Sequence, residues 1–199
     1  MKLTFVLAFL FPVFLSAQNP VKEAKKFRKE INKQYGDEDK SPLKEADRAN
    51  FKKLEFYDID SEFAVQAKLD WFEKDSVFEM KTTTARLAKY RRSGVATFII
   101  DGNELELVFY QNVKGATNPL YKDYYFLPFK DNTNGEESYG GGRYIDLIID
   151  EGSADAQINF NIAYNPYCAY NDRYSCPIVP SENYINIEIK AGVKAPAEH

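Results

Sequence analysis

The sequence predicts a mainly β protein, an antiparallel meander of about eight strands that forms a barrel or a sandwich, with two N-terminal helices. Three observations predict this class. Apolar and polar residues alternate with a period of two from Phe56 onward. The alternating segments are short, and no segment with helical spacing interrupts them. Asp101-Gly102-Asn103, which lies between two of them, is typical of a tight hairpin.

Length and composition indicate one domain with a hydrophobic core, because the 199 residues are 44% hydrophobic and 28% charged. We expect four regions: a signal peptide over 1–18, a helical segment over 19–54 that packs on the body, an antiparallel β domain over 55–194, and a tail over 195–199. The formal net charge of −4 argues against nucleic acid or anionic lipid as the main partner. The sequence leaves the oligomeric state open.

The first residues have the pattern of a secretory signal. Lys2 precedes an apolar run from Leu3 to Leu15, and the small residues Ser16 and Ala17 follow. We expect cleavage after Ala17 or Gln18, export to the periplasm or the medium, and no stable membrane insertion afterwards. An uncleaved membrane anchor is the alternative.

Two helices are expected before the strands. Asn19-Pro20 supplies a cap and a proline at the first helical position, and Gly36 ends the first helix. Ser41-Pro42 begins a second, shorter helix that runs to about Phe51. One face of the first helix carries apolar residues at helical spacing: Ala24, Phe27, Ile31 and Tyr35.

The strand pattern divides the rest of the chain into short alternating segments. The hairpin residues 101–103 separate two of them, with Leu105, Leu107 and Phe109 on one side of the second. The most regular segment is 184–190, where Ile185, Ile187 and Ile189 point inward. The predicted strands cover residues 63–69, 78–80, 95–100, 105–110, 124–129, 144–149, 158–163 and 184–190.

Cys168 and Cys176 are the two cysteines of the chain, and an exported protein favours a disulfide between them. Such a short closed loop would stabilise the fold by roughly 2–3 kcal/mol. Two free thiols in the core are the alternative. We expect no metal and no cofactor, because the sole histidine, His199, ends the chain and the cysteine spacing is poor for zinc.

The last third of the chain concentrates glycine, asparagine, tyrosine and proline in turns. Motifs there and earlier in the chain carry a family resemblance. The motifs are Ser41-Pro42-Leu43, Phe126-Leu127-Pro128-Phe129, Tyr139-Gly140, Gly142-Arg143-Tyr144, Phe160-Asn161, Ala163-Tyr164-Asn165-Pro166, Cys176-Pro177 and Glu182-Asn183. With these motifs in this order, the chain resembles the bacterial and archaeal domain of unknown function 1684 family. The resemblance implies membership and no activity, because the family has no established function.

Two positions depart from the family pattern. The family usually has aspartate where this chain has Asn159, and glutamate where it has Val193. Chemistry that depends on either carboxylate in relatives is therefore doubtful here. An amide such as that of Asn159 cannot act as a general base.

Four residues at strand ends and loops form the predicted ligand-binding site: Arg143, Asn161, Tyr164 and Glu182. A guanidinium at position 143 can hold a carboxylate or a phosphate in bidentate geometry. The alternative is a structural ion pair with Asp131, Asp146 or Glu182. Asn159 and Asn161 would share one face of a strand and line a barrel interior, or else lie in solvent.

The sequence favours non-catalytic binding of a small polar or anionic molecule. A histidine-based triad is excluded because no histidine lies within the fold, and neither cysteine has a histidine partner. A hydrolase or lyase that uses carboxylates or tyrosine is one alternative, with Glu182 as a candidate acid or base. An envelope protein-interaction module is another, and it would have a closed core and an exposed aromatic patch.

Overall fold

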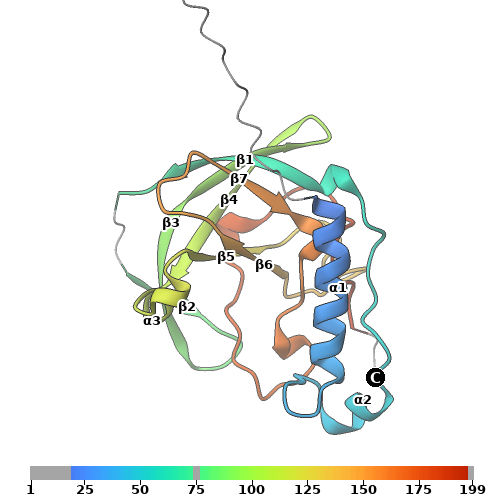
Figure 1. Ribbon diagram of the computed structural model, residues 1–199. Coiled ribbons are helices and arrows are strands. Elements are labelled where there is room, and N and C mark those ends of the chain that lie inside the picture. Colours follow the sequence, from blue (N-terminus) through green and yellow to red (C-terminus); the bar gives the residue numbers. More distant parts are fainter. Residues whose placement is uncertain (1–18, 74–76, 197–199) are drawn as a thin grey trace, which may run out of the picture.

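The computed structural model describes residues 19–73 and 77–196 of the chain (Figure 1). The predicted signal peptide over 1–18 and His199 lie outside the described residues. None of the helices in these two ranges is long and apolar enough to cross a membrane.

The described strands form one seven-stranded antiparallel sheet, curled into a half-barrel (Figure 1). Its order is β6-β5-β4-β3-β1-β7, and β2 pairs with β3 off this path. The predicted fold class is thereby confirmed, with a curled sheet in place of a closed barrel or a sandwich. The strands are β1 (Ala64–Trp71), β2 (Phe78–Lys81), β3 (Leu87–Ile100), β4 (Asn103–Asn112), β5 (Tyr124–Phe129), β6 (Arg143–Ile148) and β7 (Asp155–Asn159).

The predicted hairpin between β3 and β4 is confirmed. Asp101 and Gly102 have φ values of 50° and 74°, the left-handed conformation that a tight two-residue turn requires. The turn fixes the register so that Ile100 pairs with Asn103, and the pairing continues to Tyr90 on β3 and Asn112 on β4. This hairpin is the longest pairing in the sheet and forms its centre.

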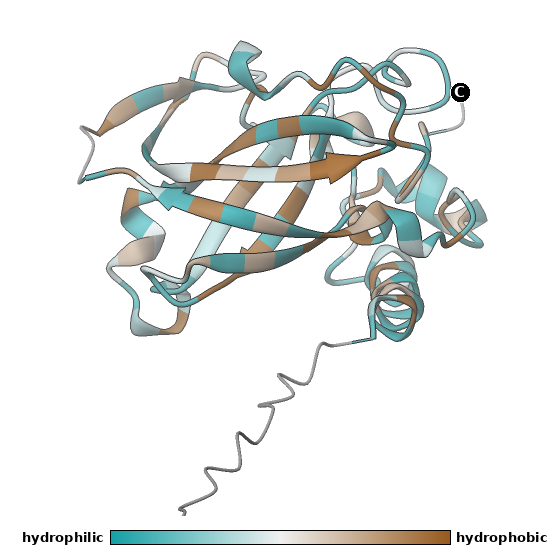
Figure 2. Ribbon diagram, turned by 90° about the horizontal axis from the view of Figure 1, so that it is seen from above, coloured by the Kyte–Doolittle hydropathy of each residue, from teal (hydrophilic) through white to brown (hydrophobic). Residues whose placement is uncertain are grey.

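Apolar and polar residues alternate along the strands, which Figure 2 shows as brown and teal segments in turn. Each face of the sheet carries a buried apolar cluster. We call the side that carries Phe109, Leu127 and Ile145 the inner face, since it encloses the main core. The side that carries Phe126 and Tyr144 is the outer face, and it holds a second apolar cluster. Both faces are covered, so the strands have few solvent-facing positions near these clusters.

A β-bulge in β3 moves this strand from one face to the other. Tyr90 belongs to the outer cluster, whereas Phe98 belongs to the main core, and the register shifts between Arg92 and Gly94. Only glycine fits after the bulge. A Cβ at position 94 would lie 2.5 Å from the Asp70 carbonyl oxygen and 2.6 Å from the Phe109 ring.

The first helix, α1 (Pro20–Gly36), begins and ends where the sequence predicts. The Asn19 side chain accepts a hydrogen bond from the Lys22 amide at 3.1 Å, and Ala24, Ile31 and Tyr35 are buried. The second helix, α2 (Glu45–Asn50), ends near Phe51 as expected but begins at Glu45, three residues after the Ser41-Pro42 that was expected to begin it. The other helical turns are α3 (Val113–Ala116) and the 3-10 turns η1 (Ser61–Phe63), η2 (Pro119–Tyr121), η3 (Phe160–Ile162), η4 (Tyr167–Ala169) and η5 (Ser181–Asn183).

Two predicted strands differ in the structure. The segment 184–190 buries Ile185 and Ile189 but forms no strand: it bends at Asn186 and Ile187, and it pairs only through a bridge between Tyr184 and Lys130. Its polar backbone groups bond to a loop and to side chains: the Asn132 amide donates to the Ile187 carbonyl, and the Ile189 amide donates to the Asp131 carboxylate. The other prediction, a strand over 158–163, is wrong after Asn159, because η3 begins at Phe160.

The two ends of the curled sheet approach each other at one point, which we call the seam. There the Tyr144 amide donates to the Tyr164 carbonyl at 2.9 Å, and the Tyr164 amide donates to the Tyr144 carbonyl at 3.0 Å. Tyr144 belongs to β6, and Tyr164 follows η3 at the end of β7. A single bridge therefore joins the edges, and α1 lies beside it (Figure 1).

Gly94→Ala should destabilise the fold by roughly 1–3 kcal/mol, because the new methyl group overpacks the contact between β1, β3 and β4. Urea unfolding measures this change. Gly115→Ala is the control, since a Cβ there would lie no closer than 3.6 Å to its neighbours and alanine is favoured in a helix. An unchanged midpoint for Gly94→Ala would contradict the packing described for the bulge.

Candidate ligand-binding site

Arg143, the first residue of β6, is fully buried and held by internal bonds. Its Nη2 lies 2.6 Å from an oxygen of the buried Asp131 carboxylate and donates to the Ile189 carbonyl at 2.8 Å. Its Nη1 donates to the Ala191 carbonyl. The planar group also lies 5.1 Å from the centre of the Phe129 ring. This is the structural ion pair that the sequence left open as the alternative for Arg143.

Asp131 has its second oxygen engaged as well. That oxygen accepts hydrogen bonds from the Thr133 amide at 2.9 Å and from the Thr133 hydroxyl at 2.6 Å. The pair therefore joins β6, the loop after β5 and the C-terminal segment. Arg143 points to the inner face of the sheet, and its terminal nitrogens have internal partners.

Asn161 is fully buried in η3 and bonds to the backbone of a distant segment. The Asp60 amide donates to its Oδ1 at 2.9 Å, and its Nδ2 donates to the Asp60 carbonyl at 2.6 Å. Its backbone amide donates to Oδ1 of Asn159, which caps the turn. Asn159 also donates to the Pro20 carbonyl at 3.0 Å and to the Glu23 carboxylate at 2.8 Å, and so it attaches the start of α1.

Glu182 lies in η5 on the surface. Its carboxylate pairs with Arg92 at 2.9 Å and accepts a hydrogen bond from the Tyr110 hydroxyl. Burial and this carboxylate raise the pKa of Tyr110. Glu182 does not line the cavity described below, and neither do Arg143 and Asn161. The structure thus separates the four predicted residues, and Tyr164 alone of them lines that cavity.

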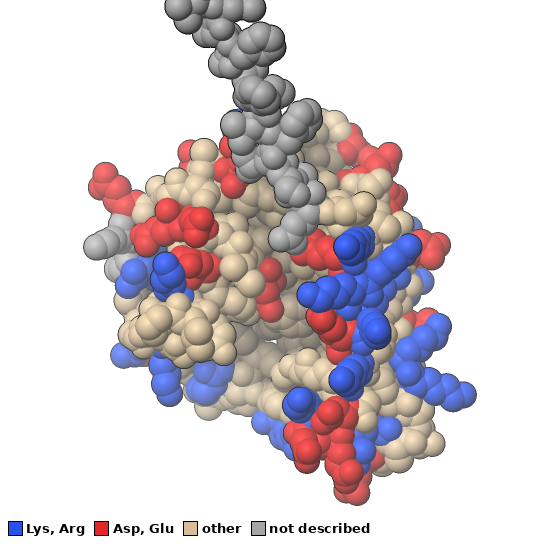
Figure 3. Space-filling view, in the orientation of Figure 1, with Lys and Arg blue, Asp and Glu red and all other residues tan. Residues whose placement is uncertain are grey.

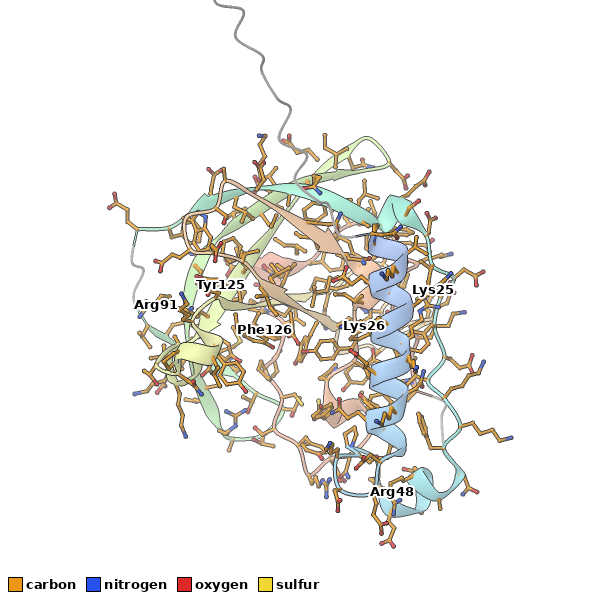
Figure 4. The ribbon with its side chains drawn as sticks, in the orientation of Figure 1. Lys25, Lys26, Arg48, Arg91, Tyr125 and Phe126 are labelled. Atoms are coloured by element: carbon orange, nitrogen blue, oxygen red, sulfur yellow. The ribbon has the colours of Figure 1, made fainter. Side chains whose placement is uncertain are left out.

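A cavity of about 480 Å³ lies between α1 and the outer face of the sheet at the seam. Figure 3 shows the surface hollowed beside α1 at this level. Phe126, labelled in Figure 4, marks the sheet side, and Lys26 marks the helix side. The lining residues are Phe27, Glu30, Ile31, Gln34, Tyr35, Tyr124, Tyr144, Asp146, Tyr164, Pro166, Tyr167 and Cys176.

The helix wall follows from the spacing of side chains on α1. Phe27, Glu30, Ile31 and Gln34 recur at three- and four-residue intervals and therefore share one face. Along this face, the Gln34 amide donates to the Tyr167 hydroxyl at 2.6 Å, which attaches the end of α1 to η4. The wall is thus fixed by the helix period and by one hydrogen bond to the opposite loop.

The sheet wall follows from alternation on β6 and from its register with β5. Tyr144 and Asp146 are two positions apart, so both lie on the outer face, opposite to Arg143. Asp146 pairs with Phe126, and Tyr124 lies two residues before Phe126 on the same face. The sheet wall therefore contributes one carboxyl group, that of Asp146, together with the phenols of Tyr124 and Tyr144.

Asp146 is half-buried and bonds to phenols. The Tyr164 hydroxyl donates to its Oδ1 at 2.8 Å, and Tyr124 is a second hydrogen-bond partner. Burial raises the pKa of Asp146 above its ordinary value of 3.8, while these two hydrogen bonds act in the opposite direction. Burial and the adjacent carboxyl raise the pKa of Tyr164 and of Tyr124, so both phenols stay protonated at neutral pH.

Tyr35 contributes a fully buried hydroxyl to the same region. This hydroxyl has no hydrogen-bond partner within residues 19–73 and 77–196. Tyr170 lies beside it, with ring centroids 5.1 Å apart, and burial together with this neighbouring phenol raises the pKa of Tyr35. A buried polar group without a partner is unfavourable in a stable fold, and it suits a site that a ligand completes.

The predicted disulfide is not present. Cys168 and Cys176 are free thiols, and the Cys168 amide donates to the Cys176 sulfur at 3.3 Å. The two side chains share a hydrogen bond in place of a covalent bond, which lowers the pKa of Cys168 to about 6 and raises that of Cys176. Within the described residues, no cluster of three or more histidine, cysteine or carboxylate side chains is arranged to hold a metal ion.

Sequence reasoning missed most of this cavity. Asp146 entered only as a possible partner of Arg143, and Tyr144 only as part of a family motif. The alternation of side chains along β6 could have shown that Arg143 and Asp146 do not meet, because residues 143 and 146 must point to opposite faces of a strand. The α1 wall had no comparable signal, since nothing local to the helix indicates which part of the sheet it covers.

The fold and the cavity define a class of protein: a curled antiparallel sheet whose seam is covered by an N-terminal helix, with a tyrosine-lined cavity between them. A family model described as "Protein of unknown function (DUF1684)" matches residues 49–194, and the chain belongs to this family. The matched range includes the sheet wall of the cavity and excludes α1.

One solved structure is similar over most of its length. It is the solution NMR structure of an uncharacterized protein of Haloarcula marismortui, with a TM-score of 0.70 and 28% sequence identity. The similarity covers 90% of this chain and 96% of that chain. No curated protein matches the chain.

Arg143→Met should destabilise the protein by roughly 3–5 kcal/mol, because it leaves the buried Asp131 carboxylate unpaired. Adding Asp131→Asn should restore part of this loss. Arg92→Met, which removes a half-exposed pair with Glu182, is the control and should cost less than about 1 kcal/mol. Urea unfolding at neutral pH compares the variants. Equal losses for the two single arginine variants would contradict the role assigned to Arg143.

Asp146→Asn should change how stability depends on pH. Because the pKa of Asp146 is raised in the folded state, the wild type loses stability as pH rises from its ordinary value of 3.8 through the folded value. The asparagine variant lacks this loss. Its Tm relative to wild type should therefore be highest near about pH 7 and should fall toward about pH 3. Thermal unfolding across this range measures the difference, and the opposite trend would refute a raised pKa.

Proposed function

We propose that this chain is an exported protein that binds a small polar molecule, without catalysis, in the cavity between α1 and the seam. One observation carries the proposal: a carboxyl group, several phenols and an unpartnered hydroxyl converge on a cavity of about 480 Å³. Cavities of roughly 300–1,000 Å³ with mostly aromatic walls and a few polar groups are typical of small-molecule sites.

The unfavourable burial of the Asp146 carboxyl group supports a role in ligand binding. Asp146 is held in a partly desolvated position that raises its pKa, and its hydrogen-bond partners are neutral phenols. By contrast, the buried Asp131 neutralises Arg143. A carboxyl group that burial disfavours and that neutralises no buried cation is a candidate for binding.

Export is the second part of the proposal, and the sequence of residues 1–18 supports it. Cleavage after Ala17 or Gln18 would leave Asn19, which caps α1, on the mature chain. The helix wall of the cavity would then be intact in the exported protein. Comparison of the mass of the secreted form with that of the full chain would locate the cut.

An acid/base enzyme is a second candidate, and the hydrogen bond from Tyr164 to Asp146 favours it. A carboxyl group with a raised pKa beside a phenol is an arrangement that can transfer protons. Tyr164→Phe separates the two functions, because it keeps the ring and removes the hydroxyl. Loss of turnover with retained binding would favour the enzyme. The third alternative, an interaction module, was expected to have a closed core, and the cavity argues against it.

The test is protein-observed NMR with a panel of sugars, amino acids, carboxylic acids, amines and phosphate. At least one class should shift the backbone amide signals of residues 144–146 and 164. Glu30→Trp, at the exposed rim of the cavity, should block this response. Lys29→Trp places the same side chain on α1 outside the lining and should leave the response unchanged. A panel that shifts no signal around the cavity would refute small-molecule binding there.

A further inference from the structure

We propose that the cavity binds an organic ammonium ion, with its positive charge between the tyrosine rings and Asp146. This inference rests on the proposed function and specifies the class of ligand. Three independent observations support it: the charges of the lining, the arrangement of the rings, and the hydrogen-bond partners of the carboxyl group.

The lining residues carry negative charge only. Glu30 and Asp146 are acidic, and no lysine or arginine of residues 19–73 and 77–196 belongs to the lining. Lys26 of α1 is exposed, and its Nζ lies 3.9 Å from a Glu30 carboxylate oxygen, a distance that gives a weak surface pair. A cavity with this charge pattern repels phosphates and carboxylates and attracts a cation.

The rings form walls that meet at steep angles. Tyr144 and Tyr164 have centroids 5.9 Å apart and planes at 88°, and Tyr35 and Tyr167 have centroids 6.3 Å apart and planes at 71°. Phe27 faces Tyr164 from the helix at 6.4 Å. Aromatic walls around a small volume hold alkylammonium groups when a ring face is turned to the cation.

The carboxyl group at the sheet wall has no cationic partner. Asp146 bonds to the Tyr164 and Tyr124 hydroxyls, and within the described ranges it takes part in no ion pair. Two donated hydrogen bonds orient the carboxylate and stabilise its ionised form. An ammonium ion would supply the missing positive charge, while the phenols keep the carboxylate in place.

Two probes distinguish the effect of ligand charge on binding from the effect of ligand shape. Choline carries a trimethylammonium group, and 3,3-dimethyl-1-butanol has the same shape with a neutral carbon in place of nitrogen. Tetramethylammonium, putrescine and acetate extend the comparison to a minimal quaternary ion, a primary amine and an anion. NMR titrations of the mature chain follow the amide signals of residues 144–146 and 164.

At least one of the three cations should shift these signals in a saturable manner, and the neutral isostere and acetate should not. Asp146→Asn should weaken binding by about tenfold or more, because the charge pair is partly desolvated. Glu182→Gln removes a surface carboxylate outside the lining and should leave the affinity unchanged. The Tm and circular dichroism of each variant confirm that it is folded.

The outcomes separate the two proposals. Equal binding of choline and its neutral isostere, a preference for acetate, or an unchanged affinity in folded Asp146→Asn would overturn the ammonium assignment. So would the failure of all three cations to bind. In each of these cases, small-molecule binding survives if another class in the wider panel shifts the cavity signals and Glu30→Trp blocks the shift. If no class does so, both proposals fail.

Discussion

The buried pair between Arg143 and Asp131 is the contact on which the rest of the structure depends. It fixes the start of β6 against the loop after β5 and against the carbonyls of the C-terminal segment. Because β6 is held there, Tyr144 can meet Tyr164 and bring the two ends of the sheet together. A charge pair with no exposure to water tolerates little displacement, since either ion left alone would be strongly unfavourable. The contacts of Arg143 on the inner face of the sheet therefore determine where the seam forms.

The seam explains why a cavity exists at this place. A closed barrel satisfies its edge strands by pairing them along their length, whereas here a single bridge joins the edges. The remaining space is covered by α1, whose side chains cannot interdigitate with the sheet as a neighbouring strand would. Alternation then decides what enters the space: Arg143 turns inward, and Tyr144 and Asp146 turn outward. Arg143 of the structural pair and Tyr144 and Asp146 of the cavity thus come from one strand.

The sequence predicted local features well and long-range contacts poorly. The cap at Asn19, the hairpin at 101–103 and six of the eight predicted strands depend on nearby residues, and the structure confirms them. Residues 184–190 were misassigned because their alternation is real but their backbone partners are a loop and the Asp131 carboxylate. The site residues were chosen for their type and not for their direction, so Arg143, Asn161 and Glu182 entered the site although each has a structural partner. The disulfide between the cysteines was predicted from the expected export of the protein. The spacing of the two cysteines alone could not show whether they are bonded.

The position of α1 outside the sheet has a consequence for how this family can diversify. Its wall residues Phe27 and Glu30 are partly or fully open to solvent, so substitutions there leave the main core untouched. Asp146, Tyr124 and Tyr144 of the opposite wall belong to strands whose register is constrained by two buried clusters. If the cavity binds a ligand as we propose, substitutions on one surface helix can change its selectivity while the sheet wall stays the same.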